Sequence, residues 1–315
     1  MDDLAIIVVS HNDAKWLVPC ISSIFNNAGV LRLDVVVADN GTDGAADLVQ
    51  REFSSVRALR LENRGFGSAN NEARRTCDAR YVLFLNPDTE VVEGTFAALI
   101  AALDERPEVG AAGVVQIASD GSLQLSIRRF PNALRALGEA FGVERLPVSA
   151  TWLGERELDA HRYELEVDCD WTSGSFLIVR REALESAGAF DERFFVYGEE
   201  PDLCLRIKKA GWSVRHLPTM RIVHHAGRAG IDARLEAQNA YARLLHARKH
   251  FSPLHRAMFV GAHAVRYALR SVAPEGGAKG RRVASRRALR TLLALERPPF
   301  EPPTQVAIPV TETSR

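Results

Sequence analysis

Two patterns of apolar residues alternate along the first third of the chain. Short apolar runs occupy residues 4–9, 35–38, 56–61, 81–85 and 110–117. Between these runs, apolar residues recur every three or four positions at 14–25, in the segment that ends at Phe53, at 66–77 and at 94–104. The short runs are typical of buried strands and the longer period is typical of helices. This β-α-β alternation predicts right-handed crossovers and a doubly wound, mostly parallel sheet.

The middle of the chain is less regular. Residues 128–161 show weak periodicity and several turn residues, which favours an irregular connection. Residues 167–179 are typical of two short strands around 172–175, and 181–186 of a helix that Gly188 ends. A further helix is expected at 201–210, with Pro201 at its first position, Gly211 as its stop and an ion pair between Asp202 and Arg206.

The last part of the chain is expected to be helical from Ile231 and basic from Arg256 to Arg297, with few acids. Two interpretations have equal weight: a helix that lies on an anionic membrane, and a packing helix with a solvated basic face. We therefore expect an α/β domain at 1–250, a basic helical region with possible membrane association at 251–297, and a disordered proline-rich tail at 298–315.

Composition narrows the classes of function. Forty basic and forty acidic residues cancel, so no overall field favours nucleic acid as a partner. The four cysteines lack the short paired spacing of zinc or redox sites and are expected to be free thiols. The N-terminus lacks a signal-peptide pattern, and no apolar stretch approaches the roughly 18 residues of a spanning helix. These features predict a cytoplasmic protein.

A carboxylate follows the most apolar strand. Residues 81–85 stop at Asn86-Pro87-Asp88, and ligands of open α/β sheets bind just beyond such strand ends. Asp88 is therefore expected at the mouth of the sheet, where a hard cation and a phosphate could share its oxygens.

Polar residues also follow the first two strands. Ser10 and Asn12 end the first, and Asp39 and Asn40 end the second. Asp39 could accept the ring N–H of a pyrimidine or bind a ribose hydroxyl. Alternatively, Asp39 and Asn40 only form turns.

A loop at 63–71 carries glycines and opens a helix. Helix N-termini attract phosphates, and Arg64 adds charge. The loop does not match G-x-G-x-x-G, because Asn70 occupies the third glycine position, which argues against a nicotinamide dehydrogenase. The alternative is a simple turn before the helix.

Three carboxylates, Glu199, Glu200 and Asp202, are crowded at one expected helix start. Acids near a helix N-terminus are stabilised by the dipole, but three exceed what capping needs. Crowding and the nearby aromatic side chains would raise the pKa of one of them and make it a general base.

These motifs, taken in order, resemble glycosyltransferase family 2, and especially bacterial rhamnosyltransferase-type members. They are Val-Ser-His-Asn, Ala-Asp-Asn-Gly-Thr-Asp, Glu-Asn-Arg-Gly-Phe-Gly, Leu-Asn-Pro-Asp-Thr, Trp-Thr-Ser-Gly, Gly-Glu-Glu-Pro-Asp-Leu-Cys-Leu-Arg and His-His-Ala-Gly. The resemblance covers roughly residues 4–250. It implies a GT-A fold and an inverting transfer from a nucleotide-activated sugar.

The resemblance also implies roles for single residues. The nucleoside and donor residues would be Ser10, Asn12, Asp39, Asn40, Asn63, Arg64, Gly65, Asn71 and Asn86. Asp88 and His224 would approach Mg²⁺ or Mn²⁺ and the diphosphate, although His224 and His225 could equally be a polar pair at a strand end. Glu200 would be the base, with Glu199 as the alternative base, and Glu199 and Asp202 in support.

The acceptor residues would be Arg128, Arg129, Trp171, Ser173 and Gly174, because paired arginines suit the diphosphate of a polyprenyl-linked acceptor. The donor would be a dTDP- or UDP-sugar, best dTDP-rhamnose, and the acceptor a glycan or lipid-linked glycan in cell-surface polysaccharide synthesis. The chain lacks the Gln-x-x-Arg-Trp mark of processive synthases, which favours addition of one sugar.

Two alternative functions stay open. Asn86 replaces the first carboxylate of the family's Asp-x-Asp motif, so a catalytically silent sugar-nucleotide-binding protein is one alternative. A nucleotidyltransferase of similar sheet topology is the other, and it is disfavoured because the carboxylates at 199–202 would have no clear role in it. A homodimer and association with the inner face of the cell membrane are further open expectations.

Overall fold

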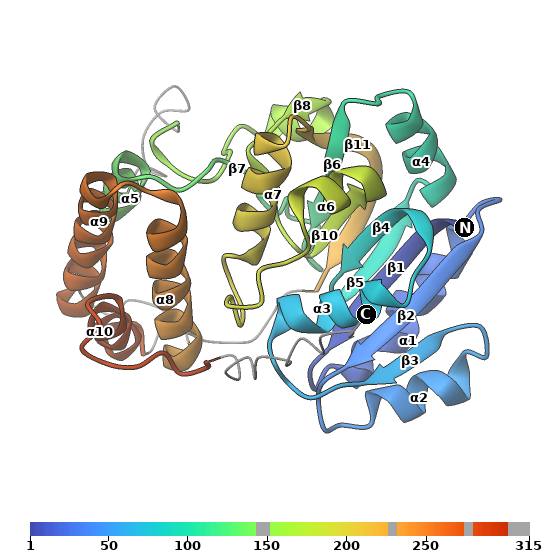
Figure 1. The fold of residues 1–315 in the computed structure, drawn as a ribbon, viewed down its shortest axis with the longest axis horizontal. Coiled ribbons are helices and arrows are strands. Elements are labelled where there is room, and N and C mark those ends of the chain that lie inside the picture. Colours follow the sequence, from blue (N-terminus) through green and yellow to red (C-terminus); the bar gives the residue numbers. More distant parts are fainter. Residues whose placement is uncertain (143–151, 226–231, 274–279, 302–315) are drawn as a thin grey trace, which may run out of the picture.

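A computed structural model describes residues 1–142, 152–225, 232–273 and 280–301 of the chain (Figure 1). The strands are β1 (Asp2–Ser10), β2 (Leu33–Asp39), β3 (Arg57–Arg60), β4 (Ala79–Leu85), β5 (Thr89–Glu93), β6 (Val109–Ile117), β7 (Ile127–Arg128), β8 (Val167–Asp168), β9 (Trp171–Thr172), β10 (Phe176–Arg180) and β11 (Ser213–His224). The helices are α1 (Ala14–Asn26), α2 (Ala45–Glu52), α3 (Phe66–Arg75), α4 (Phe96–Asp104), α5 (Ala133–Ala140), the 3₁₀ helix η3 (Ala160–Glu164), α6 (Arg181–Ala187), α7 (Glu199–Lys209), α8 (Ala233–His250), α9 (Pro253–Val272) and α10 (Arg281–Leu292).

The main sheet runs in the order β3-β2-β1-β4-β10-β6-β11-β5, with β8 paired to β11. The neighbours β1, β2, β3 and β4 pair in parallel, as the alternation of runs predicts. Strands β10, β5 and β8 add antiparallel pairs. The predicted α/β fold with a largely parallel sheet is confirmed.

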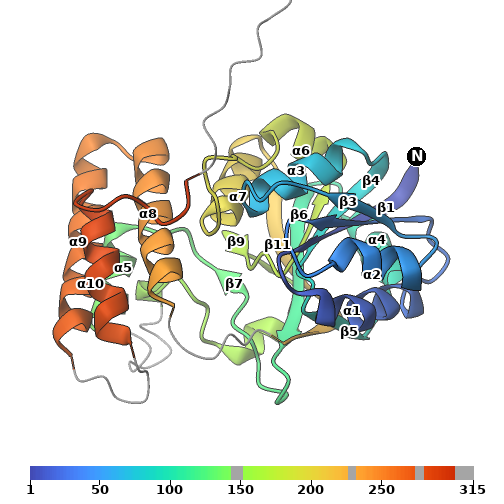
Figure 2. The ribbon, with the colours of Figure 1, turned by 90° about the horizontal axis from the view of Figure 1, so that it is seen from below.

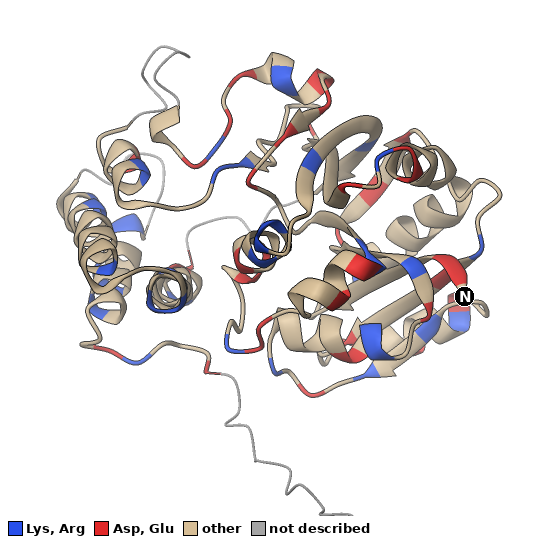
Figure 3. Cartoon of the chain, turned by 45° about the horizontal axis from the view of Figure 1, so that its top comes forward, with Lys and Arg blue, Asp and Glu red and all other residues tan. Residues whose placement is uncertain are grey.

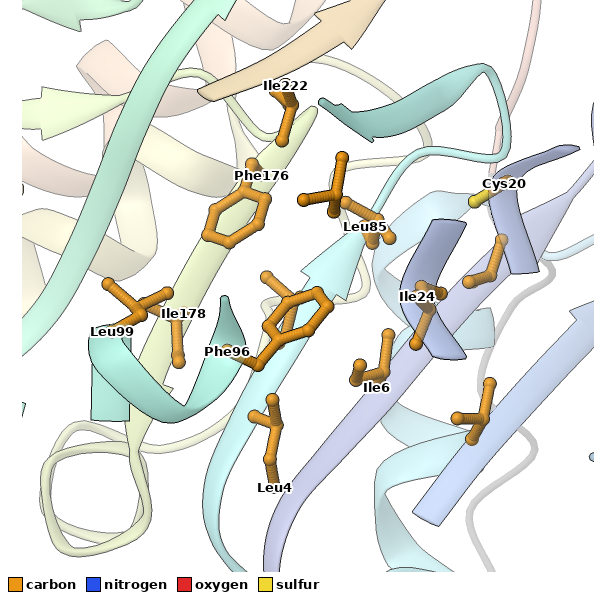
Figure 4. Close-up of a cluster of buried hydrophobic side chains, with 14 of the residues drawn as sticks. Leu4, Ile6, Cys20, Ile24, Leu85, Phe96, Leu99, Phe176, Ile178 and Ile222 are labelled. Atoms are coloured by element: carbon orange, nitrogen blue, oxygen red, sulfur yellow. The ribbon is translucent and has the colours of Figure 1, made fainter. Parts of the chain in front are cut away.

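Side chains of the sheet alternate between two apolar layers, because successive residues of a strand point to opposite faces. On one face of the sheet, helices α1, α2 and α4 cover Leu4, Ile6 and Val8 of β1. On the other face, helices α3, α6 and α7 cover Ile7 and Val9 of the same strand. Figure 4 shows the first layer, where Phe96 and Leu99 of α4 lie among side chains of β1, β4 and β10. Helices on both faces explain why these strands are continuous apolar runs.

The register brings the ends of three strands to one edge. Ser10, the last residue of β1, lies opposite Asp39, the last residue of β2, and Val8 lies opposite Leu85, the last residue of β4. The polar segments that begin at His11, Asn40 and Asn86 therefore leave the sheet side by side. This edge is the place where the sequence predicts ligand binding.

Helices α5, α8, α9 and α10 lie together beside the sheet (Figures 1 and 2). Their core includes Ala240, Leu244, Tyr267, Ala288 and Leu292. Phe194, from the loop before α7, packs on Ala242 and Leu245 of α8 and so joins the two parts. Because α8 packs with α9 and α10, we propose that the helical region includes α8 from Ala233 on, whereas the sequence suggests a start at residue 251.

Several local predictions have clear outcomes. Helix α7 ends at Lys209 before Gly211, which has a φ of 95°, and the ion pair of Asp202 with Arg206 is confirmed at 2.9 Å. Pro201 is the third residue of α7 and not the first. The interval 128–161 contains α5, and Phe300, expected in a disordered tail, stacks on Phe195 with ring centroids 5.2 Å apart. The four cysteines are free, as predicted.

None of the helices in the described residues has both the length and the apolar character required to traverse a membrane.

Candidate active site

A cavity of about 870 Å³ opens at the edge where β1, β2 and β4 end. One wall comes from the segments after these strands, a second from the Gly198–Pro201 stretch at the start of α7, and a third from α8. The cavity therefore lies between the sheet and the helical region. The lining includes Asn12, Asn40, Asn63, Gly65, Asn86, Asp88, Arg128, Trp171, Ser173, Gly174, Glu199 and Glu200, all of which the sequence predicts as site residues.

Three asparagines form the wall nearest to β1 and β2. Asn12 has a φ of 60°, and its Oδ1 accepts a hydrogen bond from the backbone N–H of Thr42 at 2.8 Å. Asn40 donates from Nδ2 to Oδ1 of Asn63 at 3.5 Å, and its own Oδ1 is buried without a partner. A buried carbonyl oxygen without a partner is costly, so a donor group of a ligand would satisfy it.

Other predicted nucleotide-binding residues do not line the cavity. Asp39 accepts hydrogen bonds from the backbone N–H groups of Gly41 at 3.0 Å and Ala46 at 2.9 Å. These are the contacts of a turn former. Asn71 binds the backbone of Phe190 in both directions, at 2.9 and 3.1 Å.

Ser10 and Arg64 are also absent from the lining. The Ser10 side chain is fully buried, and Nε of Arg64 is buried without a hydrogen-bond partner. The geometry thus divides the predicted set into lining asparagines and residues that support the loops behind them.

The glycine of the 63–66 loop is required by close packing. Gly65 has a φ of 102°, and a Cβ there would collide with the backbone of Phe195. The next residue, Phe66, donates its backbone N–H to the carbonyl oxygen of Phe195 at 2.7 Å. Any larger residue at 65 would displace the loop that leads into α7, because both the space and the φ value favour glycine.

Asp88 lies close to His224, as the sequence suggests for a metal and diphosphate site. The distance from Oδ1 of Asp88 to Nε2 of His224 is 3.3 Å, and Nδ2 of Asn86 is 3.4 Å from the same nitrogen. The other ring nitrogen of His224 lies 2.8 Å from Oε1 of Gln124, which fixes the orientation of the ring. Gln124 is a site residue that the sequence analysis missed.

A carboxylate oxygen and an imidazole nitrogen suit a divalent cation such as Mn²⁺, with water and ligand phosphates as its further ligands. Among the described residues no group of three or more His, Cys, Asp or Glu side chains forms a cation site. Asp88 and His224 would therefore supply only part of the coordination shell.

Glu199 and Glu200 start α7 and both line the cavity. Burial, together with the charge of Glu200, raises the pKa of Glu199 well above the ordinary range, and Oε2 of Glu199 is buried without a partner. Burial also raises the pKa of Glu200, which receives hydrogen bonds from its own backbone N–H and that of Gly174. Glu199 also receives backbone hydrogen bonds, from its own N–H and from that of Tyr197, but the charge of Glu200 raises its pKa further, whereas the charge of Arg128 opposes the rise at Glu200. Glu200 is thus the better placed of the two to be ionised.

Gly174 is needed beside Glu200. A Cβ at position 174 would collide with Oε1 of Glu200. The absence of a side chain allows the backbone N–H to reach the carboxylate.

Asp202 has a different position from the one the sequence analysis suggests. It is fully buried and does not line the cavity. Its carboxylate contacts Arg206 at 2.9 Å, Lys249 at 2.6 Å and His250 at 2.7 Å. Burial alone would raise the pKa of Asp202, but these partners outweigh it and hold the pKa at about 2. Asp202 therefore links α7 to the end of α8.

The two arginines predicted for the acceptor diphosphate have different environments. Arg128 lines the cavity, with its guanidinium 5.5 Å from the centre of the Trp171 ring. Arg129 lies outside the cavity and donates to Glu157 at 2.5 Å and to the carbonyl oxygen of Arg156 at 3.0 Å.

The helical region contributes residues that the sequence analysis missed. The cavity is also lined by Leu235, Asn239, Ala242, Arg243, His246, Phe259 and Phe300. Oε1 of Glu155 is 2.7 Å from Nη1 of Arg243, so the 152–157 segment is tied to α8. No local motif marks these residues, because their role depends on contacts between distant parts of the chain.

Comparison with known proteins identifies the family. The model of "Glycosyl transferase family 2" matches residues 5–186. An N-acetylglucosaminyl-diphospho-decaprenol L-rhamnosyltransferase of Mycobacterium tuberculosis is 31% identical over 241 residues, which cover 71% of this chain and 76% of the relative. Rhamnosyltransferase WbbL of Escherichia coli is 25% identical over 70% of this chain and 83% of its own length.

Solved structures show the same fold. The mannosyltransferase PcManGT from Pyrobaculum calidifontis, in complex with GDP-Man and Mn²⁺, has a TM-score of 0.54 and 20% identity and covers 95% of this chain and 82% of its own. GalNAc-T7 with UDP, GalNAc and Mn²⁺ has a TM-score of 0.57 and 10% identity and covers 93% of this chain and 56% of its own. The fold is GT-A, and the chain belongs to glycosyl transferase family 2 and is a glycosyltransferase.

Proposed function

We propose that this glycosyltransferase transfers one sugar, with inversion, from a nucleotide-sugar donor to a diphosphate-linked lipid glycan. L-Rhamnose from dTDP-rhamnose is the donor that we favour, and cell-surface polysaccharide synthesis is the process. The observation that carries the proposal is that Asp88, after β4, and Glu200, at the start of α7, line the same cavity. The names of the mycobacterial and E. coli relatives support rhamnose, and that of the first supports a diphosphate-linked lipid acceptor.

The donor nucleoside would lie against Asn12, Asn40 and Asn63, where the unpartnered Oδ1 of Asn40 accepts a ligand N–H or O–H. Ser10, Asp39, Arg64 and Asn71 would shape this wall from behind. Gly65 would let the loop approach the donor, and Asn86 would hold His224 in place.

The diphosphate would lie at Asp88 and His224, together with Mg²⁺ or Mn²⁺. The ion would neutralise the charge that develops on the leaving phosphate oxygen. Gln124 orients His224, and the short chain connection through Pro87 fixes Asp88 at the end of β4.

Glu200 would act as the general base. It takes the proton of the acceptor hydroxyl while that oxygen forms a bond to the anomeric carbon, and the bond from that carbon to the diphosphate oxygen breaks with its electron pair. Glu199, kept neutral by burial, would shape the site without a competing charge. Trp171, Ser173 and Gly174 would form the acceptor wall next to Glu200.

We further propose that the protein works at the inner face of the cell membrane, because the proposed acceptor is lipid-linked. The support is structural: α9 and α10 contain eight arginines and no acidic residue. Figure 3 shows basic bands along these helices, which lie on the left, as in Figure 1. Basic helices are attracted to anionic headgroups.

The test is a transfer assay with purified full-length protein. A panel of dTDP-, UDP- and GDP-sugars is combined with prenyl-diphosphate-linked N-acetylglucosamine, with and without Mn²⁺, and product mass and nucleoside diphosphate release are measured. We expect turnover with dTDP-rhamnose that depends on a divalent cation and gives the inverted anomer. Donor binding without turnover in every combination would refute the proposal.

A further inference from the structure

Arg128 lines the cavity and forms no ion pair with a carboxylate of the described residues. Among the described residues its side chain makes no hydrogen bond and no ion pair, and its Nε is buried. Burial and the nearby charge of Arg156 lower the pKa of Arg128, yet an arginine keeps its proton in proteins. A desolvated guanidinium without a counter-ion is costly, so its position indicates an anionic ligand.

Three other cations on this side, all in the described part of the chain, contact carboxylates. Arg243 contacts Glu155 at 2.7 Å and 3.3 Å, and Arg129 contacts Glu157. Lys208 lies 3.7 Å from Asp170. Arg128 thus differs from these three cations, because no carboxylate of the described residues contacts its guanidinium.

The position of Arg128 indicates which ligand binds it. Strand β7 pairs with β9, and Arg128 lies opposite Trp171. Two residues after β9, Gly174 contacts Glu200. The charge of Arg128 also reaches Glu200, where it opposes the rise in pKa that burial causes. Arg128 therefore lies on the side of the proposed base, whereas Asp88 follows β4 and His224 ends β11.

We propose that Arg128 forms an anion subsite that recognises the diphosphate of the acceptor and not that of the donor. This inference rests on the proposed function, because it needs an acceptor whose sugar carries a diphosphate. The planar guanidinium would bind phosphate oxygens through its N–H fork, and the Trp171 ring supports it on one side. Neutral acceptors would lack this contact.

The subsite is tested by binding, independently of turnover. Farnesyl diphosphate serves as a probe of the acceptor subsite and dTDP with Mn²⁺ as a probe of the donor site, both measured by calorimetry on the full chain. We expect Arg128→Met to weaken farnesyl diphosphate binding about tenfold or more, the loss typical of a charge-assisted hydrogen bond. The same variant is expected to bind dTDP as the wild type does.

Arg129→Met is the matched control, because it removes the adjacent arginine that faces Glu157. It is expected to bind both probes normally. Arg128→Met breaks no hydrogen bond or ion pair among the described residues and removes a desolvated charge, so its thermal midpoint is expected to stay near that of the wild type.

Three outcomes would overturn the subsite. They are an unchanged affinity of Arg128→Met for farnesyl diphosphate, an equal loss for dTDP, and an equal loss in Arg129→Met. Lack of sugar transfer in the donor panel, with farnesyl diphosphate binding still dependent on Arg128, would instead refute the proposed function and leave the anion subsite intact.

Discussion

At the scale of single residues, Glu199 and Glu200 give a paired prediction. Glutamine resembles a protonated glutamate in shape, so Glu199→Gln is expected to change kcat less than about fivefold if the buried Glu199 is already neutral. Glu200→Gln removes the base and is expected to lower kcat by about 10²- to 10⁴-fold. Initial rates with dTDP-rhamnose and excess acceptor check both variants.

The dependence of activity on pH is a second test of the assignment of Glu200 as the general base. A base is active when ionised, so activity rises with pH through the pKa of Glu200. Burial raises that pKa, which places the acidic limb above the value of about 4.3 for a free glutamate. A large loss in Glu199→Gln together with full activity in Glu200→Gln would reverse the two roles.

The sequence could show the acidic residues but not their separate functions. Glu199, Glu200 and Asp202 form one cluster in the chain. What separates Asp202 is its contacts with Lys249 and His250, which come from a helix about 50 residues later. Such long-range contacts leave no mark in a local motif, whereas the loops after β1, β2 and β4 were predictable because a parallel sheet aligns its strand ends.

At the scale of elements, strands β5 and β11 could not be predicted from the sequence, for a similar reason. Strand β11 contains Pro218 and polar positions, and β5 follows β4 after a short turn, so neither forms a clear apolar run. Their pairing depends on the neighbouring strands. The buried strands β1, β2, β4 and β6 were predictable because both of their faces are covered.

Helix α9 presents an apolar stripe to solvent. Leu254, Met258, Val265, Leu269 and Val272 are all exposed, from 41% to 71%. Their spacing of four, seven, four and three residues keeps them on one side of the helix. An exposed apolar stripe on an arginine-rich helix is typical of segments that lie in a membrane interface.

We expect the Met258→Asp, Leu269→Asp double variant to lose binding to vesicles that contain anionic phosphatidylglycerol, by about tenfold or more in a sedimentation assay. The wild type is expected to bind neutral phosphatidylcholine vesicles more weakly, and added salt is expected to reduce binding. Val30→Asp, which changes a residue that is 96% exposed near the sheet, is the control.

If the stripe instead contacts a second copy of the chain, the wild type would show a concentration-dependent mass by light scattering and the double variant would not. Equal vesicle binding by wild type and double variant would exclude the membrane role of α9.

At the scale of the whole molecule, the cavity exists because the sheet and the helical region are held together. The links between them include Phe194 on α8, the ion pair of Glu155 with Arg243, and the Asp202 cluster. The Asp202 cluster is the most buried of these charged links, because the Asp202 carboxylate is 0% exposed. It connects α7, which carries Glu200, to α8, which forms the opposite wall.

Asp202→Asn is therefore expected to lower the free energy of unfolding at pH 7 by about 3 kcal/mol, because it leaves Arg206, Lys249 and His250 without their shared anion. The Asp202 pKa is about 2 in the folded protein and near 3.9 in an unfolded chain, so the stabilisation is complete above about pH 5 and is lost as pH falls toward 2. In urea denaturation, the gap between wild type and variant should be constant from pH 7 to about pH 5 and smaller at pH 3. Asp47→Asn, which breaks an exposed pair with Arg60, should cost less than about 1 kcal/mol at any pH. Equal losses in the two variants would show that the buried cluster does not hold α7 to α8.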